Sequence, residues 1–314
     1  MAWKTVRGRE YLYRKQRGDW KSLGPRSPET EAIHRRFHAG RERGRERLEG
    51  LTQRLDRMAP VNRALQLGRM PMIAARVLRA LSNARLIGNV VEVVGTNALF
   101  AYERLAGVQV AGGHLATEDV DLLFDARRSL RVLTTEVAAS GILGVLRKVD
   151  GSFDIVGRSG FRAANRDGYL VDLIMPAPKD PMRTAPRSRI GSDGEDLQAV
   201  EIAGLAWLVN APKAEATILD ARGYPLAITV PDPRAFALHK SWLSERTDRD
   251  PVKRRRDAAQ AKLVADLVRT HLPHLAFDDP ALAALPQALR DRAAALVRDA
   301  LTTEGEGDRL EPDW

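Results

Sequence analysis

The chain of 314 residues contains no cysteine and has a formal net charge of +9. Without cysteine it can form no disulfide, no zinc–thiolate site and no thiol nucleophile, and this composition is typical of a reducing compartment. No apolar run approaches the roughly 18 residues of a membrane span, and the first residues lack the apolar centre of a signal peptide. We therefore expect a soluble cytoplasmic protein with no membrane partner.

Positive charge is concentrated in the first part of the chain. Residues 1–60 contain 16 lysine and arginine residues against 8 acidic ones, whereas the remainder is close to neutral. A basic arm beside a neutral body predicts a polyanionic partner, and RNA is favoured over a membrane because the arm has no broad apolar face. A solvated helix surface is the alternative interpretation of the same residues.

The first ninety residues contain a short aromatic segment and two predicted helices. Residues 1–26 alternate aromatic and basic side chains around glycine turns, which predicts a small loop or hairpin element. Ser27 and Pro28 are typical of an N-cap and a first helical position, so a long helix should begin there. A second helix is expected over residues 69–86, and we expect an apolar stripe of the long helix to pack against another helix. The stripe consists of Ile33, Phe37, Leu48, Leu51, Leu55 and Met58, with Gly40 and Gly44 in its middle.

The hydrophobic period changes near residue 90. A strand, a helix, a second strand and a second helix are predicted in succession, followed by three antiparallel strands, an exposed loop, a hairpin and three helices. The loop is a candidate for closing over a site, and the last residues are expected to form a frayed tail. The ranges are 89–95, 96–107, 118–125, 126–140, 151–156, 160–164, 168–176, 177–197, 214–233, 233–246, 250–271 and 279–301.

These elements predict an α/β (α+β) chain built on a mixed sheet, with a helical N-terminal arm and a C-terminal helical domain. The length favours a core domain with one or two appended elements. We place the expected boundaries at residues 1–89 for the basic arm, 90–232 for the core and 233–314 for the C-terminal helices.

Three aspartates lie in otherwise apolar strands. Residues two apart in a strand point to the same face, so Asp119 and Asp121 present adjacent carboxylates while Val120 and Leu122 point into the core. Asp172 lies in a later apolar strand, where an unpaired charge would be costly. Carboxylates this close repel each other, and a divalent cation such as Mg²⁺ would compensate them. The alternative is that these acids lie at strand ends and form surface ion pairs.

Other common functional motifs are missing or weak. The sequence has no G-x-x-x-x-G-K-[ST] loop and no G-x-G-x-x-G after a strand, which argues against kinase and dehydrogenase sites. His34 and His38 lie one helical turn apart but lack the glutamate of a zinc protease, so we interpret them as a surface pair. Tyr11, Tyr13 and Trp20 lie among basic residues, which suggests either a stacking-plus-phosphate surface or a hairpin packed on the body.

A Gly-Thr follows the first strand of the core, at Gly95 and Thr96. An Asp-x-Asp lies on the next strand and a third aspartate on a later one. This order resembles the DNA polymerase β-like nucleotidyltransferase superfamily, and it implies that Gly95 and Thr96 contact the β- and γ-phosphates of a nucleoside triphosphate. It further implies that Asp119 and Asp121 bridge two Mg²⁺ ions, with Mn²⁺ as a substitute, and that Asp172 holds the ion that activates the attacking hydroxyl.

One departure from the family pattern is the longer spacing between the Gly-Thr and the Asp-x-Asp. We expect the extra residues, 107–118, to form a loop between helix and strand, and their glycines would permit it.

The C-terminal helices contain a second resemblance. A lysine in one helix, an arginine about two turns on and a basic-Asp pair in the next helix are similar to the pattern in abortive-infection and toxin–antitoxin nucleotidyltransferases. The matching residues are Lys240, Arg246 and Arg256-Asp257. The resemblance implies that Lys240 reaches the nucleotide phosphates, while Arg246 either contacts a phosphate or pairs with Asp257. The chain is also similar to predicted bacterial proteins with a nucleotidyltransferase fold.

Together these resemblances imply a magnesium-dependent enzyme that moves a nucleoside monophosphate from an NTP such as ATP to a hydroxyl acceptor and releases pyrophosphate. RNA, above all tRNA, is the expected acceptor because of the basic arm, and a protein or a small molecule is the alternative. A toxin role, with an antitoxin or another protein as partner, extends the second resemblance. The competing hypothesis is a non-catalytic nucleic-acid- or partner-binding protein on the same fold, and the presence of all three aspartates favours the enzyme.

Overall fold

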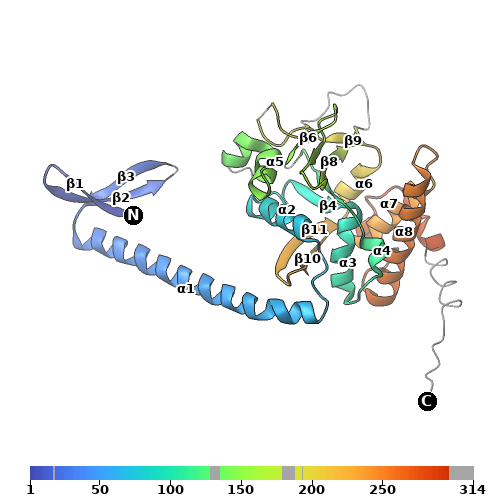
Figure 1. The fold of residues 1–314 in the computed structure, drawn as a ribbon, viewed down its shortest axis with the longest axis horizontal. Helices are drawn as coiled ribbons and strands as arrows, with labels where there is room; N and C mark the ends of the chain where they lie inside the picture. The colour runs from blue at the N-terminus through green and yellow to red at the C-terminus, as the bar shows by residue number, and fades with distance from the viewer. Residues whose placement is uncertain (17, 128–134, 179–187, 193, 297–314) are drawn as a thin grey trace, which may run out of the picture. The chain divides into compact units, whose positions relative to one another are not determined.

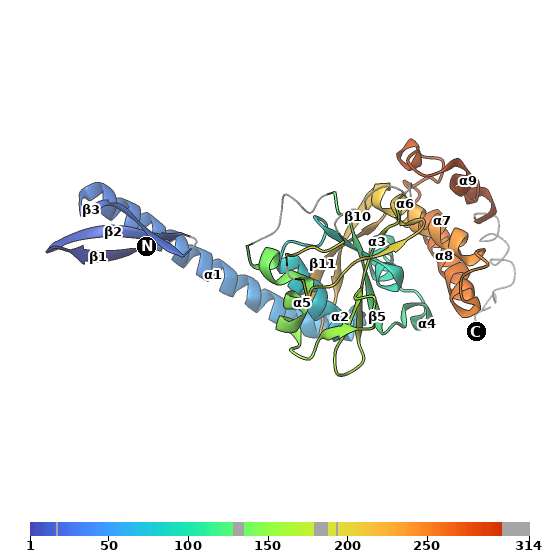
Figure 2. The same cartoon turned by 90° about the horizontal axis from the view of Figure 1, so that it is seen from above.

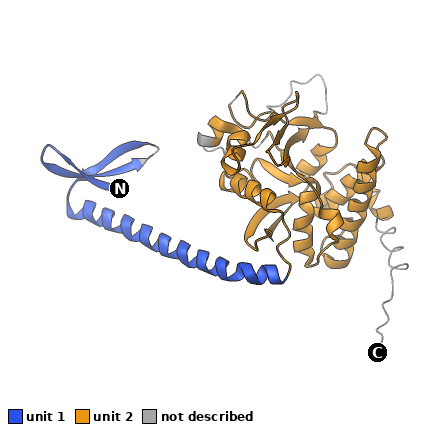
Figure 3. Ribbon diagram, in the orientation of Figure 1, with its two compact units in different colours: residues 1–65 blue, residues 66–314 orange. Residues whose placement is uncertain are grey.

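The computed structural model describes residues 1–16, 18–127, 135–178, 188–192 and 194–296. The chain divides into two compact units, Met1–Leu65 and Gln66–Trp314, which are coloured separately in Figure 3. Within the described ranges, no helix is both long enough and apolar enough to cross a membrane.

The first unit is a three-stranded antiparallel sheet followed by a long helix, α1 (Pro28–Ala64), as Figure 1 shows. Helix α1 begins where the sequence predicts, because the Ser27 hydroxyl accepts a hydrogen bond from the backbone N–H of Thr30, and the Thr30 hydroxyl accepts one from the N–H of Ser27. The expected hairpin element therefore has a third strand. The strands, in sheet order, are β1 (Ala2–Val6), β2 (Arg9–Gln16) and β3 (Asp19–Pro25).

One face of this small sheet packs on the beginning of α1. Leu12 is fully buried, and its partner on β1, Trp3, points to the same side. The ring of Trp3 lies 5.5 Å from the ring of His34 on α1, measured between centroids. The opposite face of the sheet is turned away from the helix.

The apolar stripe of α1 does not pack on a second helix. Leu48 is 65% exposed and Met58 is 50% exposed, so only the beginning of the stripe, at Ile33 and Phe37, is partly buried. Among the described residues of this unit the stripe therefore has no helix to pack on, and its partner stays a prediction. The physical reason is that α1 is the one helix among the described residues of the unit, and its sheet covers only the first turns.

A mixed sheet forms the centre of the second unit (Figures 1 and 2). Strand β4 is antiparallel to β5, β5 is parallel to β8, and β7 and β6 continue antiparallel beyond β8, with β9 also paired to β8. This arrangement confirms the predicted mixed α/β class. The strands are β4 (Val91–Val94), β5 (Asp119–Phe124), β6 (Asp154–Val156), β7 (Arg162–Ala164), β8 (Leu170–Pro176) and β9 (Val200–Ile202).

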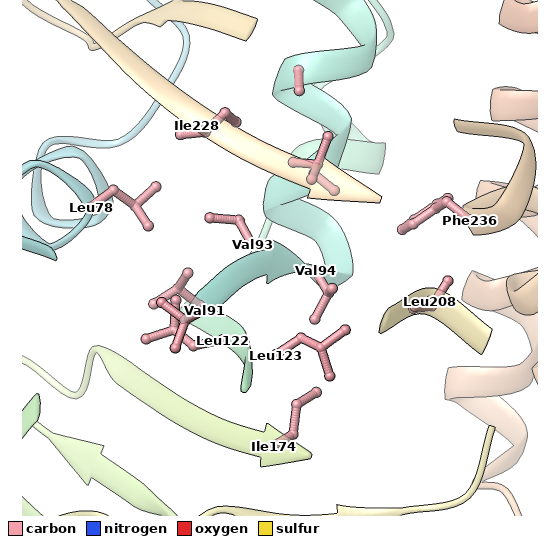
Figure 4. Close-up of a cluster of buried hydrophobic side chains, with 14 of the residues drawn as sticks. Leu78, Val91, Val93, Val94, Leu122, Leu123, Ile174, Leu208, Ile228 and Phe236 are labelled. Carbon is pink, nitrogen blue, oxygen red and sulfur yellow. The ribbon is translucent and has the colours of Figure 1, made fainter. Parts of the chain in front are cut away.

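Apolar side chains cover both faces of the central sheet, as Figure 4 shows. Leu122 of β5 points to the side of Leu78, which belongs to helix α2. Leu123 points to the other side, toward Leu208 of helix α6. Because residues two apart in a strand share a face, the aspartates of β5 lie on the side of Leu123.

Helices bring distant parts of the chain to this second face. Helix α7 packs along α8, and α8 also contacts α3 and α4, the two helices between β4 and β5. Strands β10 and β11 form the predicted hairpin, and the expected extra loop contains α4. The elements are α2 (Met72–Asn83), the 3-10 turn Gly95–Ala98, α3 (Leu99–Ala106), α4 (Gly112–Leu115), α6 (Leu205–Asn210), β10 (Lys213–Leu219), β11 (Pro225–Pro231), α7 (Pro233–Ser244) and α8 (Pro251–His271).

Two predicted helices differ in extent from the structure. The helix expected over 126–140 is α5 (Thr135–Val149), with 128–134 outside the described residues. The helix expected over 279–301 is interrupted: the 3-10 turn Pro280–Leu282 and the short helix α9 (Gln287–Arg290) precede helical residues 293–296, and 297–301 lie outside the described residues. Pro286 lacks the N–H needed to continue a helix through this segment. The predicted tail and residues 179–187 and 193 of the predicted loop 177–197 also lie outside the described residues.

Candidate active site

The three predicted aspartates come together on one face of the central sheet. Strands β5 and β8 run parallel with Asp121 directly opposite Asp172, and Asp119 precedes Asp121 by two residues on the same face. The intervening Val120 is fully buried on the other side. The predicted alternation is therefore confirmed, and the register of two strands far apart in sequence adds the third carboxylate.

Asp121 has the most unusual environment of the three acids. Burial, followed by the negative charges of Asp119 and Asp172, raises its pKa to about 7, while Lys240 and Lys253 act in the opposite direction. Without a cation, burial and the neighbouring carboxylates therefore favour the protonated form of Asp121. A positive charge placed between these carboxylates would stabilise the ionised form.

Asp172 is already paired with an arginine. It is 5% exposed, and its two oxygens accept hydrogen bonds from Nε and Nη2 of Arg162 at 2.7 and 2.6 Å. Arg162 lies directly opposite on β7, and this ion pair raises the pKa of its guanidinium. Within the described ranges no three Asp, Glu, His or Cys side chains are grouped as metal ligands. In this arrangement both oxygens of the third carboxylate, Asp172, are bonded to Arg162.

Asp119 is held by the loop before it and by the turn after β4. Its carboxylate accepts a hydrogen bond from the hydroxyl of Thr117, and its backbone carbonyl accepts one from Nδ2 of Asn97 at 2.6 Å. Asn97 directly follows the Gly-Thr pair. These bonds tie the turn at the end of β4 to the beginning of β5.

Gly95 lies against the carboxylate of Asp121. Strand β4 ends at Val94, which pairs with Asp121, so the next residue turns over that side chain. The backbone of Gly95 has φ +64°, and a Cβ at this position would overlap Oδ2 of Asp121. Both the left-handed backbone and the close approach require glycine here.

Helix α8 reaches the Gly-Thr turn with two polar side chains. The Thr96 hydroxyl accepts hydrogen bonds from Nη2 of Arg256 at 2.6 Å and from Nε2 of Gln260 at 3.1 Å. Arg256 also donates to the carbonyl of Ala116 in the loop before β5, at 2.8 Å. The guanidinium of Arg256 thus lies beside the turn that is expected to bind phosphate.

Of the other residues predicted from the C-terminal helices, Lys240 and Asp257 pair with each other and Arg246 does not join them. Lys240 Nζ lies 2.7 Å from Asp257, and burial lowers the pKa of Lys240 while the carboxylate opposes that shift. Arg249 occupies the other oxygen of Asp257 at 2.5 Å. Arg246 pairs instead with Asp248, two residues on, at 2.8 Å. The pairing of Arg246 with Asp257, one of its two expected roles, is therefore not the one observed.

Three further residues that contact the predicted site residues were not predicted from the sequence: Arg162 bonds to Asp172, Gln260 to Thr96 and Arg249 to Asp257. Arg162 could have been found by extending the predicted antiparallel pairing of β7 and β8, which places it opposite Asp172. Gln260 lies four residues after Arg256 and so shares its helix face. Arg249 precedes the N-cap of α8, and no local pattern distinguishes it from Arg246 as the partner of Asp257.

A family model described as Nucleotidyltransferase matches residues 73–286, more than half of the chain. The chain belongs to this nucleotidyltransferase family. The match includes the three aspartates, the Gly-Thr turn and helices α7 and α8, so this enzyme performs nucleotidyl transfer. Searches of curated proteins and of solved structures found no match.

The stability of the metal-free nucleotidyltransferase should respond to Asp121→Asn. The pKa of Asp121 is about 7 in the folded protein and roughly 3.9 in the unfolded chain. The free energy of unfolding of wild type therefore falls as the pH rises between these two values. We expect the variant to be more stable than wild type in EDTA at pH 8, by up to about 4 kcal/mol for a pKa difference of about three units, and the difference to vanish near pH 4. Chemical denaturation across this range measures it, with the exposed Glu215→Gln on β10 as control. A pH-independent difference contradicts the assigned cause.

Gly95→Ala should abolish transfer through the clash with Asp121. The matched control is Gly107→Ala, because Gly107 also has a positive φ of +70° but open space within 4 Å of the point where its Cβ would lie. Both substitutions cost about 1–2 kcal/mol in backbone strain, measured by thermal unfolding. We expect only Gly95→Ala to lose activity, and equal activities of the two variants would show that the close approach to Asp121 has no role.

Proposed function

We propose that this nucleotidyltransferase moves a nucleoside monophosphate from an NTP to a hydroxyl of RNA, above all tRNA, in a Mg²⁺-dependent reaction that releases pyrophosphate. The observation that supports it most directly is the position of the Gly-Thr turn. Gly95 lies against Asp121, and Asp121 lies opposite Asp172, so a phosphate-binding turn and three carboxylates share one end of the sheet.

Two of the carboxylates fit a divalent cation as they stand. Asp119 and Asp121 are partly exposed, adjacent and mutually repelling, and carboxylate oxygens are ligands that Mg²⁺ and Mn²⁺ accept. Asp172 can join them once Arg162 releases it. Bound there, the ions would neutralise the phosphates and lower the pKa of the attacking hydroxyl, as in other two-metal sites.

The chain's own groups would position the nucleotide. Gly95 lets the turn lie directly against the Asp121 carboxylate, and Arg256 presents a guanidinium at the hydroxyl of Thr96. Lys240 and Lys253 lower the pKa of Asp121 through their charges, so both are close enough to attract phosphates. The Asp257 carboxylate holds Lys240 in place. ATP is the first nucleotide to test.

RNA is the proposed acceptor because of the first unit's charge. Residues 1–60 contain twice as many basic as acidic residues, and phosphate contacts of this kind weaken with salt. A protein or a small molecule is the alternative acceptor, and a salt-independent reaction would favour it. We further propose that this enzyme arrests growth as a toxin and has an antitoxin as partner. The support is the resemblance of the pattern at Lys240 and Asp257 to toxin–antitoxin nucleotidyltransferases.

Label transfer from the four α-³²P-labelled NTPs into total RNA and total protein tests the reaction. We expect wild type to label RNA with Mg²⁺ but not with EDTA. Asp121→Asn should lower transfer by at least about 10³-fold, since a lost charge contact in the transition state is worth several kcal/mol, while Glu215→Gln should match wild type. Activity of Asp121→Asn near the wild-type level contradicts the site.

The labelled pool identifies the acceptor, and a growth assay with wild type and Asp121→Asn tests the toxin hypothesis. Label in protein alone replaces RNA by a protein acceptor, and label in neither pool with NTP binding retained points to a small molecule. Induced expression in a bacterial host should arrest growth with wild type and not with Asp121→Asn if the enzyme is a toxin. Normal growth with both contradicts that role.

Arg162→Ala should make the fold depend on divalent cation. The substitution leaves Asp172 buried beside two other carboxylates, which costs about 3–5 kcal/mol in EDTA. We expect Mg²⁺ to restore part of this, so that the Mg²⁺-induced rise in Tm exceeds that of wild type. The control is Arg147→Ala, which breaks the exposed pair with Asp154. An identical Mg²⁺ response in wild type and Arg162→Ala contradicts competition between arginine and cation for Asp172.

A further inference from the structure

The outer face of the β1-β2-β3 sheet, turned away from α1, gathers aromatic and cationic side chains. Directly opposite residues of antiparallel strands point to the same side. Lys4 lies opposite Tyr11, and Lys15 lies opposite Trp20. Alternation along β2 puts these two rows on one face. The outer face therefore contains Lys4, Arg9, Tyr11, Tyr13, Lys15 and Trp20.

The acidic residues of the sheet point the other way. Glu10 and Asp19 are each one residue out of phase with the aromatic rows, and the Glu10 carboxylate accepts a hydrogen bond from Arg26 at 2.6 Å. Of the described residues on the outer face, none is aspartate or glutamate. The face is therefore positively charged with no carboxylate of its own to neutralise it.

Lys4 makes cation–π contacts with two aromatic rings of the outer face. Lys4 Nζ lies 3.9 Å from the ring centroid of Trp20 and 5.3 Å from that of Tyr13. Trp20 nevertheless remains 43% exposed, an unusual state for a large aromatic residue. A tryptophan held in place by a cation and left open to solvent is preorganised for a flat ligand.

We infer that the outer face of the β1-β2-β3 sheet binds single-stranded nucleic acid. Unpaired bases stack on exposed aromatic rings, while neighbouring lysine and arginine side chains contact the backbone phosphates. Tyr11 and Tyr13 are two residues apart on one strand, about 7 Å, which suits successive unstacked bases. The inference rests on the proposed function for its role, since it gives the acceptor RNA a binding surface.

The same chemistry disfavours other polyanions. A duplex keeps its bases stacked and offers the rings no flat partner, so phosphate contacts alone would remain. An anionic membrane would be held by the cations, but the outer face has no broad apolar surface to insert. Stacking is thus the feature that distinguishes the proposed ligand.

Fluorescence anisotropy with the full chain tests the inference. The probes are 12-nucleotide labelled oligouridine, oligothymidine of the same length, and a 12-base-pair RNA duplex, each measured over a range of salt concentrations. We expect the single strands to bind more tightly than the duplex. Trp20→Ala should weaken single-strand binding about tenfold, and Trp20→Phe should restore most of it. Tighter binding of RNA than of DNA supports RNA as the acceptor, and the reverse order reassigns the ligand to single-stranded DNA.

Two triple variants that remove the same charge test whether binding depends on this face or only on the net positive charge of the protein. Alanine at Lys4, Arg9 and Lys15 should reduce the slope of log affinity against log salt by about 2. Alanine at Arg36, Arg43 and Arg54, which lie on α1, removes the same charge and should leave most of the affinity. Equal losses in the two variants, unchanged binding by Trp20→Ala, or binding only to the duplex or to anionic vesicles would overturn the inference.

The outcome is separable from that of the proposed reaction. Asp121→Asn should bind the single strand as wild type does, because the aspartate is not on this sheet. Single-strand binding without any transfer would support the surface and contradict the reaction. Transfer into RNA that is unaffected by Trp20→Ala and by the first triple variant would support the reaction and overturn the surface.

Discussion

The repulsion between carboxylates is the constraint on which this site depends. The parallel register of β5 and β8 fixes Asp121 opposite Asp172, with Asp119 beside them. Three negative charges at one end of a sheet would destabilise the fold unless cations or protons compensate them. Arg162 neutralises one carboxylate, and the raised pKa of Asp121 reflects the charge that remains. Arg162 thus compensates one carboxylate, and the other two lie beside each other with a raised pKa at Asp121.

The remainder of the second unit brings cations and a turn to this charge. The antiparallel pairing of β4 with β5 ends at the level of Asp121, so the chain must turn there and only glycine fits. Helix α8, more than a hundred residues later, docks on α3 and places Arg256 and Gln260 at Thr96. The arrangement therefore depends both on the local strand pairing and on the packing of a helix that lies far away in the sequence.

The sequence was sufficient for the features that depend on local periodicity. Alternation predicted Asp119 and Asp121 on one face with Val120 buried behind them, and Ser27 predicted the beginning of α1. Features that depend on register or packing were not predictable in this way. The pairing of Arg249, rather than Arg246, with Asp257 depends on the path between α7 and α8. The exposure of Leu48 was missed because periodicity identifies an apolar stripe but not its partner.

The central claim is that the carboxylates of β5 and β8 form a metal-dependent nucleotide site beside the Gly-Thr turn. A crystal structure of wild type with Mn²⁺ and a non-hydrolysable NTP, with anomalous diffraction to locate the metal, tests it most directly. We expect Mn²⁺ between Asp119 and Asp121, with the triphosphate against Gly95 and Thr96. Manganese elsewhere, or a nucleotide bound away from this turn with the Asp172–Arg162 pair intact and no metal beside it, would contradict the account.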